Sequence, residues 1–348
     1  MSQVVVFAEP RRLTIQMEEE RPLGNHEVRL RTAFSGISAG TELTAYRGSN
    51  PYLHKRWDAG RRLFVPGADT SMSFPVVGFG YEECGQVVEV GSEVTGVQVG
   101  DYVYGTWGHR SHHIVGDDYA ARRVLPAGVE PILGIFSQIA AIALNGVHDA
   151  AIRVGETVAV FGLGTPGQII AQLVRRSGAT VVGVDPIPLR RRMAYQLGAI
   201  DHEIDPSTES VAERIKELTE GRGADVCIEA SGAYGALHEA IRSAAYSARV
   251  VTLGFFQGGA QALYLGEEFH HNRINLVCSQ IFGVAPELTY RWNQDRLVHT
   301  AMQMQAKGKL NLEPLITHVF SLSQAADAFR LCDEEPEKVI QVVLDFNR

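Results

Sequence analysis

The feature that most constrains this chain of 348 residues is a glycine-rich turn between an apolar strand pattern and an apolar helix pattern. The strand pattern covers Thr157 to Phe161, and the turn after it reads Gly162-Leu163-Gly164-Thr165-Pro166-Gly167. In such a turn the first glycine permits the tight bend, the second lets a pyrophosphate approach, and the third lets the helix pack on the strand. The positive end of the helix would then face the phosphates. The motif therefore predicts a dinucleotide site.

An acidic residue indicates which dinucleotide this site takes. Asp185 ends the next strand pattern, 23 residues after Gly162. A carboxylate there accepts hydrogen bonds from the ribose and repels a 2′-phosphate, which favours NAD over NADP. Three arginines at 190–192 weigh against this choice, since one of them could reach a phosphate, or they form the solvated start of a surface helix. The expected coenzyme-binding residues are Gly162, Gly164, Thr165, Pro166, Gly167, Asp185 and Arg190.

The periodicity of the apolar residues changes near residue 131, which indicates two domains. Before it, short segments alternate at period two between glycines, which is typical of an antiparallel barrel or sandwich. After it, a buried helix leads into apolar strands separated by helices, which is typical of a parallel sheet covered on both faces. The predicted fold class is α/β. The expected domains are a catalytic barrel over 1–139, completed by 286–348, and a nucleotide-binding domain over 140–285.

Charge and cysteine content exclude several classes of protein. The net charge is -8, whereas nucleic acids and acidic membrane surfaces attract basic proteins. No membrane span is expected. The four cysteines are too widely spaced for a disulfide scaffold or a cysteine-rich zinc module, and they predict a reducing, cytoplasmic location. They are Cys84, Cys227, Cys278 and Cys332.

Two motifs in the first domain carry a family resemblance that extends over essentially the whole chain. They read Gly36-Ile37-Ser38-Ala39-Gly40-Thr41-Glu42 and Gly80-Tyr81-Glu82-Glu83-Cys84-Gly85. With the nucleotide motif they resemble the medium-chain dehydrogenase/reductase family, the zinc-type alcohol dehydrogenase-like proteins. The phrase at 35–43 and the run at 269–273 are similar to the branch that contains hydroxyethyl-bacteriochlorophyllide dehydrogenase. The resemblance implies a GroES-like β-barrel, a Rossmann doubly wound parallel sheet, a small-molecule substrate, and a homodimer or homotetramer.

The same resemblance raises the question of a metal. Zinc-dependent members use a cysteine, a histidine and a third ligand, and the matching positions here are Ser38 or Ala39, Tyr81 and Ser137. None of these is a good zinc ligand. The cysteine-bearing lobe for a structural zinc is also missing. A rival metal site at His109, His112 and His113 is disfavoured, because neighbours in a strand point to opposite faces. We therefore expect neither zinc ion.

Without zinc, a side chain must handle the proton. Tyr81 is the first candidate, provided that its pKa of about 10 is lowered if it is to act as a base; alternatively, it only fills the space of the lost metal. Thr41 matches the family's proton-relay hydroxyl. Glu42 and Glu82 match acidic positions that orient the site, or else they satisfy buried partners. The expected substrate pocket contains Ser38, Trp107 and Phe136.

The predicted function is that of an NAD(H)-dependent oxidoreductase without catalytic zinc. The expected substrate is a secondary alcohol or ketone of the polyol, sugar or hydroxyalkyl class. Two alternatives stay open: a zinc-free quinone or enone reductase, and a non-catalytic nucleotide-binding redox sensor or structural subunit. The long segment at 49–79 mixes aromatic and basic residues, and either recognises the substrate or forms an oligomer contact.

Overall fold

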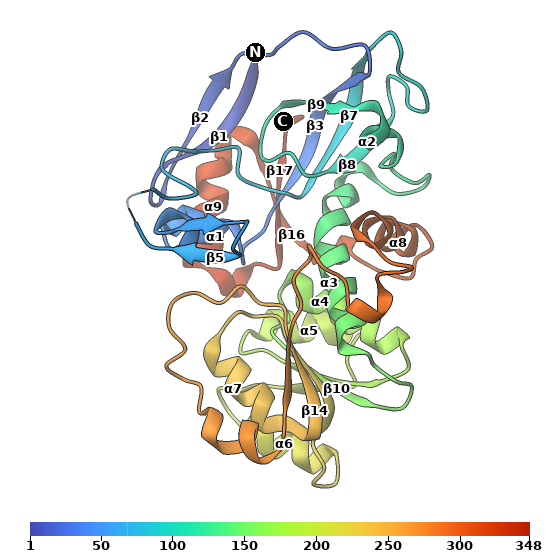
Figure 1. Cartoon of the computed structure of the whole chain (residues 1–348). Coiled ribbons are helices and arrows are strands. Elements are labelled where there is room, and N and C mark those ends of the chain that lie inside the picture. The colour runs from blue at the N-terminus through green and yellow to red at the C-terminus, as the bar shows by residue number, and fades with distance from the viewer. Residues whose placement is uncertain (68) are drawn as a thin grey trace. The chain divides into compact units, whose positions relative to one another are not determined.

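The computed structural model describes residues 1–67 and 69–348, which form two compact units (Figure 1). The first unit comprises Met1–Gln138 and Ile316–Arg348, and the second comprises Ile139–Leu315. Both are described below by themselves.

The first unit is built around one long strand, β3 (Glu27–Ile37), which pairs antiparallel with three others. These are β7 (Glu83–Val90), β9 (His112–Gly116) and β17 (Gln341–Asp345). The sheet order is β16-β17-β3-β7-β8, and only β16 and β17 run parallel. The remaining strands are β1 (Ser2–Glu9), β2 (Arg12–Glu18), β4 (Arg56–Asp58), β5 (Leu63–Val65), β6 (Val76–Val77), β8 (Tyr102–Gly105) and β16 (Ile316–Ser321).

Short helices close this unit. A core forms where α9 packs against strands β1 and β17, with Phe7, Phe329 and Leu344 fully or almost fully buried. A second core contains alternate residues of β3 and β7, which share one face of the main sheet. Examples are Val28, Leu30 and Val87. The helices are α1 (Glu42–Arg47), α2 (Asp117–Ala121) and α9 (Ala325–Glu334), with 3-10 turns at Pro51–Leu53, Pro131–Ile135, Leu322–Gln324 and Pro336–Lys338.

The second unit is a six-stranded sheet in which all neighbours run parallel. Its order, β12-β11-β10-β13-β14-β15, has the switch point of a doubly wound nucleotide-binding sheet beside β10, so the predicted Rossmann-type fold is confirmed. The strands are β10 (Thr157–Phe161), β11 (Thr180–Val184), β12 (His202–Ile204), β13 (Ala224–Glu229), β14 (Ala244–Thr252) and β15 (Asn275–Cys278).

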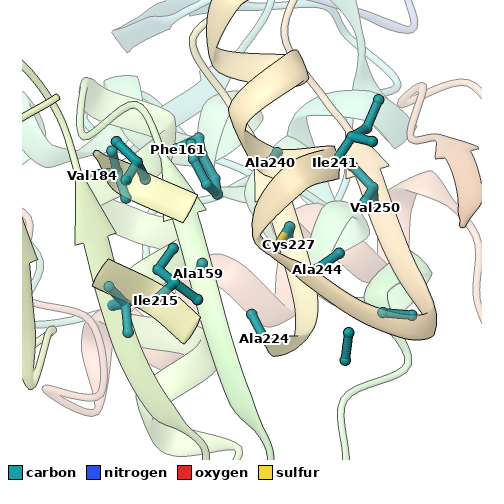
Figure 2. Packing of buried hydrophobic residues seen from close by; sticks show 14 of the residues in the cluster. Ala159, Phe161, Val184, Ile215, Ala224, Cys227, Ala240, Ile241, Ala244 and Val250 are labelled. Carbon is teal, nitrogen blue, oxygen red and sulfur yellow. The ribbon is translucent and has the colours of Figure 1, made fainter. Parts of the chain in front are cut away.

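Helices connect these strands and pack on the sheet. Figure 2 shows part of the resulting core, in which Phe161 and Val184 of the strands lie with Ala240 and Ile241 of α7. The buried strand residues are apolar on both faces, as expected for a sheet covered on both sides. The helices are α3 (Phe136–Ala150), α4 (Thr165–Arg176), α5 (Pro188–Gln196), α6 (Val211–Leu218), α7 (Tyr234–Ser243) and α8 (Gln294–Ala306), with shorter turns at Leu265–Phe269, Pro286–Leu288 and Glu313–Leu315.

The second boundary differs from the sequence-based prediction. The chain was expected to leave the nucleotide-binding domain at residue 286, but the second unit continues to Leu315. Segment 310–315 stays with it because Gln172 of α4 exchanges two hydrogen bonds with the backbone of Asn311, at 3.1 and 2.8 Å. Leu312 and Leu315 are also buried there.

One stretch among the described residues, Pro131–Ala150, is long and apolar enough to cross a membrane. Its most apolar window is 67% buried inside the protein, which is typical of a core helix. The structure therefore gives no clear membrane span.

Candidate functional site

Three hydroxyl groups meet in the first unit where β3 ends and β7 begins. Ser38 follows the last residue of β3, Thr41 precedes α1, and Tyr81 lies two residues before β7. The pairing of Ser35 with Glu83 across these strands brings the two chain segments together. The Ser38 hydroxyl hydrogen-bonds to the Tyr81 hydroxyl, which in turn donates to Thr41 Oγ1 at 3.4 Å. Three residues that the sequence singled out thus form one group.

The phenol of Tyr81 is held in its neutral form. Burial, together with the nearby carboxylate of Glu82, raises the pKa of Tyr81 above its usual value. A base at this position would need a lowered pKa, so the surroundings of the phenol argue against that role. A neutral phenol is instead a hydrogen-bond donor.

A buried acid and a histidine support this group from behind. Glu42, the first residue of α1, accepts the Ser38 backbone N–H at Oε1 over 3.1 Å. Its Oε2 lies 2.7 Å from His109 Nε2, and both side chains are fully buried. Glu42 therefore links the backbone of Ser38 to His109, and its orienting role stays a prediction.

His109 continues this network to a second acid. Its Nδ1 lies 2.6 Å from Ser35 Oγ, and the Ser35 hydroxyl donates to Glu83 Oε1 at 3.1 Å. Glu83 Oε2 also accepts the Trp107 backbone N–H at 2.7 Å. Sequence reasoning missed this network of His109 and Glu83, because His109 was considered only as a metal ligand.

Glu82 has a different hydrogen-bond partner from the residues of this network. Its Oε2 accepts a hydrogen bond of 3.1 Å from the side chain of Gln341 in β17. Burial first, and then the charges of Glu42 and Glu83, raise the pKa of Glu82 well above the usual range. Glu82 is therefore placed to act on Tyr81 through its charge state, without a direct hydrogen bond to the phenol among the described contacts.

Trp107, predicted to line the substrate pocket, is buried in the first unit. Its indole packs in the barrel core with Val28 and Leu30, donates to Thr32 Oγ1 at 2.9 Å, and stacks on His113. The expected role of Trp107 in the substrate pocket stays a prediction. Phe136 begins α3 and is fully buried, and its place in a substrate pocket stays a prediction.

The positions that would hold zinc do not fit that ion. Ser38 and Tyr81 are hydrogen-bonded to each other, and neither a serine hydroxyl nor a phenol with a raised pKa is a zinc ligand of the usual kind. Among residues 1–67 and 69–348, no three His, Cys, Asp or Glu side chains gather closely enough to bind a metal. His113 stacks on Trp107 whereas His112 bonds Ser111, so the two histidines face different surroundings.

The glycine turn in the second unit has the geometry of a phosphate-binding loop. Gly162 has φ 88°, a left-handed conformation that favours glycine. A Cβ on Gly167 would lie 1.8 Å from the carbonyl oxygen of Gly162, so only glycine allows this close approach of helix to strand. Helix α4 begins at Thr165, with Pro166 in its first turn and Gly164 as the N-cap. The N-terminus of a helix at such a turn suits an anion.

Asp185 is bound to this loop. Its Oδ2 accepts the Leu163 backbone N–H at 2.7 Å and its Oδ1 accepts that of Ile187 at 2.8 Å. Arg190 approaches Asp185 Oδ2 to 3.9 Å. Arg191 pairs with Asp205 at 2.8 Å, so a second partner already engages that guanidinium. The structure thus brings the predicted coenzyme-binding residues of the second unit together.

The segment at 49–79 forms a small hairpin of β4 and β5. Opposite residues Trp57 and Phe64 have ring centres 5.0 Å apart, and Tyr52 lies 5.3 Å from Phe64. Both Trp57 and Phe64 are exposed. The hairpin therefore presents an aromatic surface, and both predicted roles, substrate recognition and oligomer contact, remain predictions. Residue 68, within this segment, lies outside the described residues.

A glycine turn on a parallel sheet of this order, with an acid after the second strand, defines a dinucleotide-binding oxidoreductase. Comparisons with known proteins agree. Residues 24–152 match the alcohol dehydrogenase GroES-like domain, and residues 167–294 match the zinc-binding dehydrogenase family. The chain belongs to the medium-chain, zinc-type alcohol dehydrogenase family, and it is an alcohol dehydrogenase-like oxidoreductase.

Relatives of known name cover nearly the full length. D-guloside 3-dehydrogenase of Escherichia coli strain K12 is 33% identical over 98% of this chain and 99% of its own. Sorbitol dehydrogenase of Halalkalibacterium halodurans is 26% identical over 95% and 96%.

Solved structures show the same fold. An NADP-bound putative zinc-binding dehydrogenase of Sinorhizobium meliloti 1021 has a TM-score of 0.79 at 22% identity, with 99% of both chains covered. An NADH complex of the Escherichia coli CFT073 dehydrogenase rspB has a TM-score of 0.78 at 21% identity, again with 99% of both chains covered.

Proposed function

We propose that this protein is an NAD(H)-dependent oxidoreductase that interconverts a secondary alcohol and a ketone without catalytic zinc. The observation that carries the proposal is the hydroxyl group of Ser38, Tyr81 and Thr41, which occupies the positions of two expected zinc ligands. These three hydroxyls hydrogen-bond to one another, so the protein has a polar group where the family's metal would act.

The second unit supplies the coenzyme residues. When bound, a nicotinamide coenzyme gives or takes the hydride. The N-terminal amides of α4 would hold its pyrophosphate, and Asp185 would accept a ribose hydroxyl. NAD is favoured over NADP because Asp185 is 2% exposed and bonded to the loop, where a 2′-phosphate would meet its charge.

The first unit supplies the proton. During ketone reduction, the substrate oxygen gains charge and takes a proton from the Tyr81 phenol. For this step the Tyr81 O–H turns from Thr41 Oγ1 to the substrate oxygen, and the hydroxyls of Ser38 and Thr41 then donate to the phenol oxygen as it loses the proton. General acid catalysis of this kind contributes about 100- to 10,000-fold.

A polyol or sugar is the substrate class we favour. The named relatives act on a guloside and on sorbitol, both of which carry secondary hydroxyls. The exposed aromatic pair Trp57 and Phe64 offers an apolar face of the kind that polar ligands with an apolar side can cover. The similarity to the hydroxyethyl-bacteriochlorophyllide branch stays a prediction.

A turnover panel tests the proposal. With NAD⁺ and a set of simple alcohols, polyols and glycosides, we expect reduction of the coenzyme with at least one polyol or glycoside. Protein purified without chelator should contain well under one zinc per chain, and a chelator should leave the rate unchanged. Stoichiometric zinc that is needed for activity would contradict the metal-free mechanism.

The same panel separates the rival functions. Turnover restricted to quinones or enones, with NADPH preferred, would favour the reductase. Tight NADH binding without turnover of any member would favour a sensor or structural subunit. A cytoplasmic location agrees with the four free cysteines and stays a prediction.

We also propose that the chain forms a homo-oligomer through the edge of its parallel sheet. Strand β15 ends the sheet order, and its Leu276 is 42% exposed, with Phe282 close by in sequence at 82%. Unpaired apolar edge strands associate readily, and a charge on them prevents this. Light scattering should find a dimer or tetramer for the native chain and a smaller species for Leu276→Lys. A monomeric native chain would contradict the proposal.

A further inference from the structure

We propose that His109 is a positioning residue for Tyr81, acting through Glu42 and through the chain segment that precedes Tyr81. This inference rests on the proposed function, because it assigns His109 to the reaction in which Tyr81 donates the proton. Neither the family comparisons nor the sequence motifs mark this residue.

His109 is linked to the hydroxyl group of Ser38, Tyr81 and Thr41 through Glu42. The Glu42 side chain joins His109 Nε2 at 2.7 Å to the backbone N–H of Ser38 at 3.1 Å. Ser38 then bonds to Tyr81 through its hydroxyl. Any movement of the imidazole would therefore shift the turn that presents Ser38 and Thr41 to the phenol.

His109 also contacts the chain segment that carries Tyr81. A Cβ on Gly80 would lie 3.0 Å from His109 Nε2, so the chain just before Tyr81 rests against the imidazole. His109 therefore touches both arms of the site. Phe329 closes the third side with its ring centre 5.7 Å away, edge to face.

The hydrogen bonds of His109 indicate that its imidazole ring is positively charged. The Ser35 hydroxyl has one hydrogen and donates it to Glu83, so it must accept from His109 Nδ1–H. Nε2 faces a Glu42 carboxylate oxygen and donates to it. Both nitrogens then carry protons. Burial lowers the pKa of His109, but the carboxylates of Glu42 and Glu83 outweigh this and raise it.

Burying a positive imidazole together with two glutamates costs free energy, because the charged groups lose their hydration. Buried ion pairs seldom stabilise a fold more than apolar side chains of the same size. What such a pair does supply is fixed orientation, since each charged hydrogen bond has one favourable geometry. Orientation matters most beside a reacting group, where a displacement of about 1 Å can cost about 100-fold in rate.

A double-mutant cycle tests this role. His109→Gln should lower kcat about 10- to 100-fold, with the substrate KM changed less than about threefold. In a Tyr81→Phe background, His109→Gln should lower kcat no further, because the group that it positions is already lost. His113→Gln is the matched control: it is a half-buried histidine of the same unit, stacked on Trp107, and should keep its kcat within about twofold.

The inference would be overturned if His109→Gln lowered kcat by the same factor in both backgrounds. It would also be overturned if His109→Gln left kcat unchanged in the native background. Ser35→Ala is a milder second variant, which removes the Nδ1 contact and the hydroxyl's bond to Glu83 but keeps the bond between His109 and Glu42, and it should lower kcat severalfold in the native background alone. NADH binding, which reports on the second unit, should stay unchanged in folded variants. Full activity of Tyr81→Phe by itself would instead contradict the proposed function, so the two failures are distinguishable.

Discussion

Replacing Tyr81 with phenylalanine is expected to lower kcat for ketone reduction by about 100- to 10,000-fold while leaving the affinity for NADH unchanged. The substitution removes one oxygen from the centre of the hydroxyl group and keeps the ring that fills the space. The Ser38 hydroxyl loses its hydrogen-bond partner, but no charged group loses one. Steady-state kinetics with the best substrate of the panel, together with an NADH titration, measure both quantities.

Tyr46→Phe is the control for this change. Tyr46 is another buried tyrosine of the same unit, and it packs in the core against Phe7 and Phe329 rather than in the hydroxyl group. We expect it to keep kcat within about twofold, as substitutions outside a reacting centre do. Equal rates for Tyr81→Phe and the native enzyme would show that Tyr81 only fills space.

The pH profile gives an independent check on the charge state. Because the pKa of Tyr81 is raised above its usual value near 10, the phenol keeps its proton throughout the neutral and mildly alkaline range. Loss of that proton can lower the rate of ketone reduction only above about pH 10. A fall of kcat with a midpoint near pH 7 or 8 that disappears in Tyr81→Phe would contradict this assignment.

Replacing Gly167 with alanine is expected to weaken NADH binding at least about tenfold, the effect of roughly 1.4 kcal/mol on the binding free energy. The added Cβ would lie 1.8 Å from the backbone oxygen of Gly162, so the helix and the loop must move apart. The amides at the start of α4 would then no longer converge on the pyrophosphate. Fluorescence titration measures the dissociation constant.

Gly235→Ala provides the matched control, since Gly235 also lies in the first turn of a helix, α7, but a Cβ there meets nothing within 4 Å. It should bind NADH like the native chain. The native chain should also bind NADH more tightly than NADPH, and Asp185→Ala should reduce that preference. Unchanged NADH binding by Gly167→Ala would show that the coenzyme does not use this loop.

Local patterns were enough to predict the nucleotide-binding unit. Strand β10 occupies the predicted residues 157–161, and α4 begins inside the glycine motif. The reason is that buried parallel strands and glycine turns leave their signature in consecutive residues. The return to the first unit was placed too early, because the hydrogen bonds of Gln172 with Asn311 join segments 139 residues apart.

Sequence alone was less informative about the hydroxyl site. It singled out Ser38, Tyr81 and Thr41 through a family motif, and the structure brings these residues together. It also suggested Trp107 as a pocket residue; the indole packs in the barrel core, and a role in the pocket stays a prediction. An aromatic residue in a sequence does not reveal whether it faces a core or a ligand, because apolar surface is buried in both.

The sequence by itself determined the two-unit α/β organisation and the dinucleotide loop, since both depend on residue types at fixed local spacing. The side chains at the expected zinc positions followed from the family resemblance. Only the tertiary structure decided the charge environment of Tyr81 and the place of His109. Their partners, Glu42, Glu82 and Glu83, become neighbours through strand pairing and burial, and the cost of burying a charge exists only once the chain is folded.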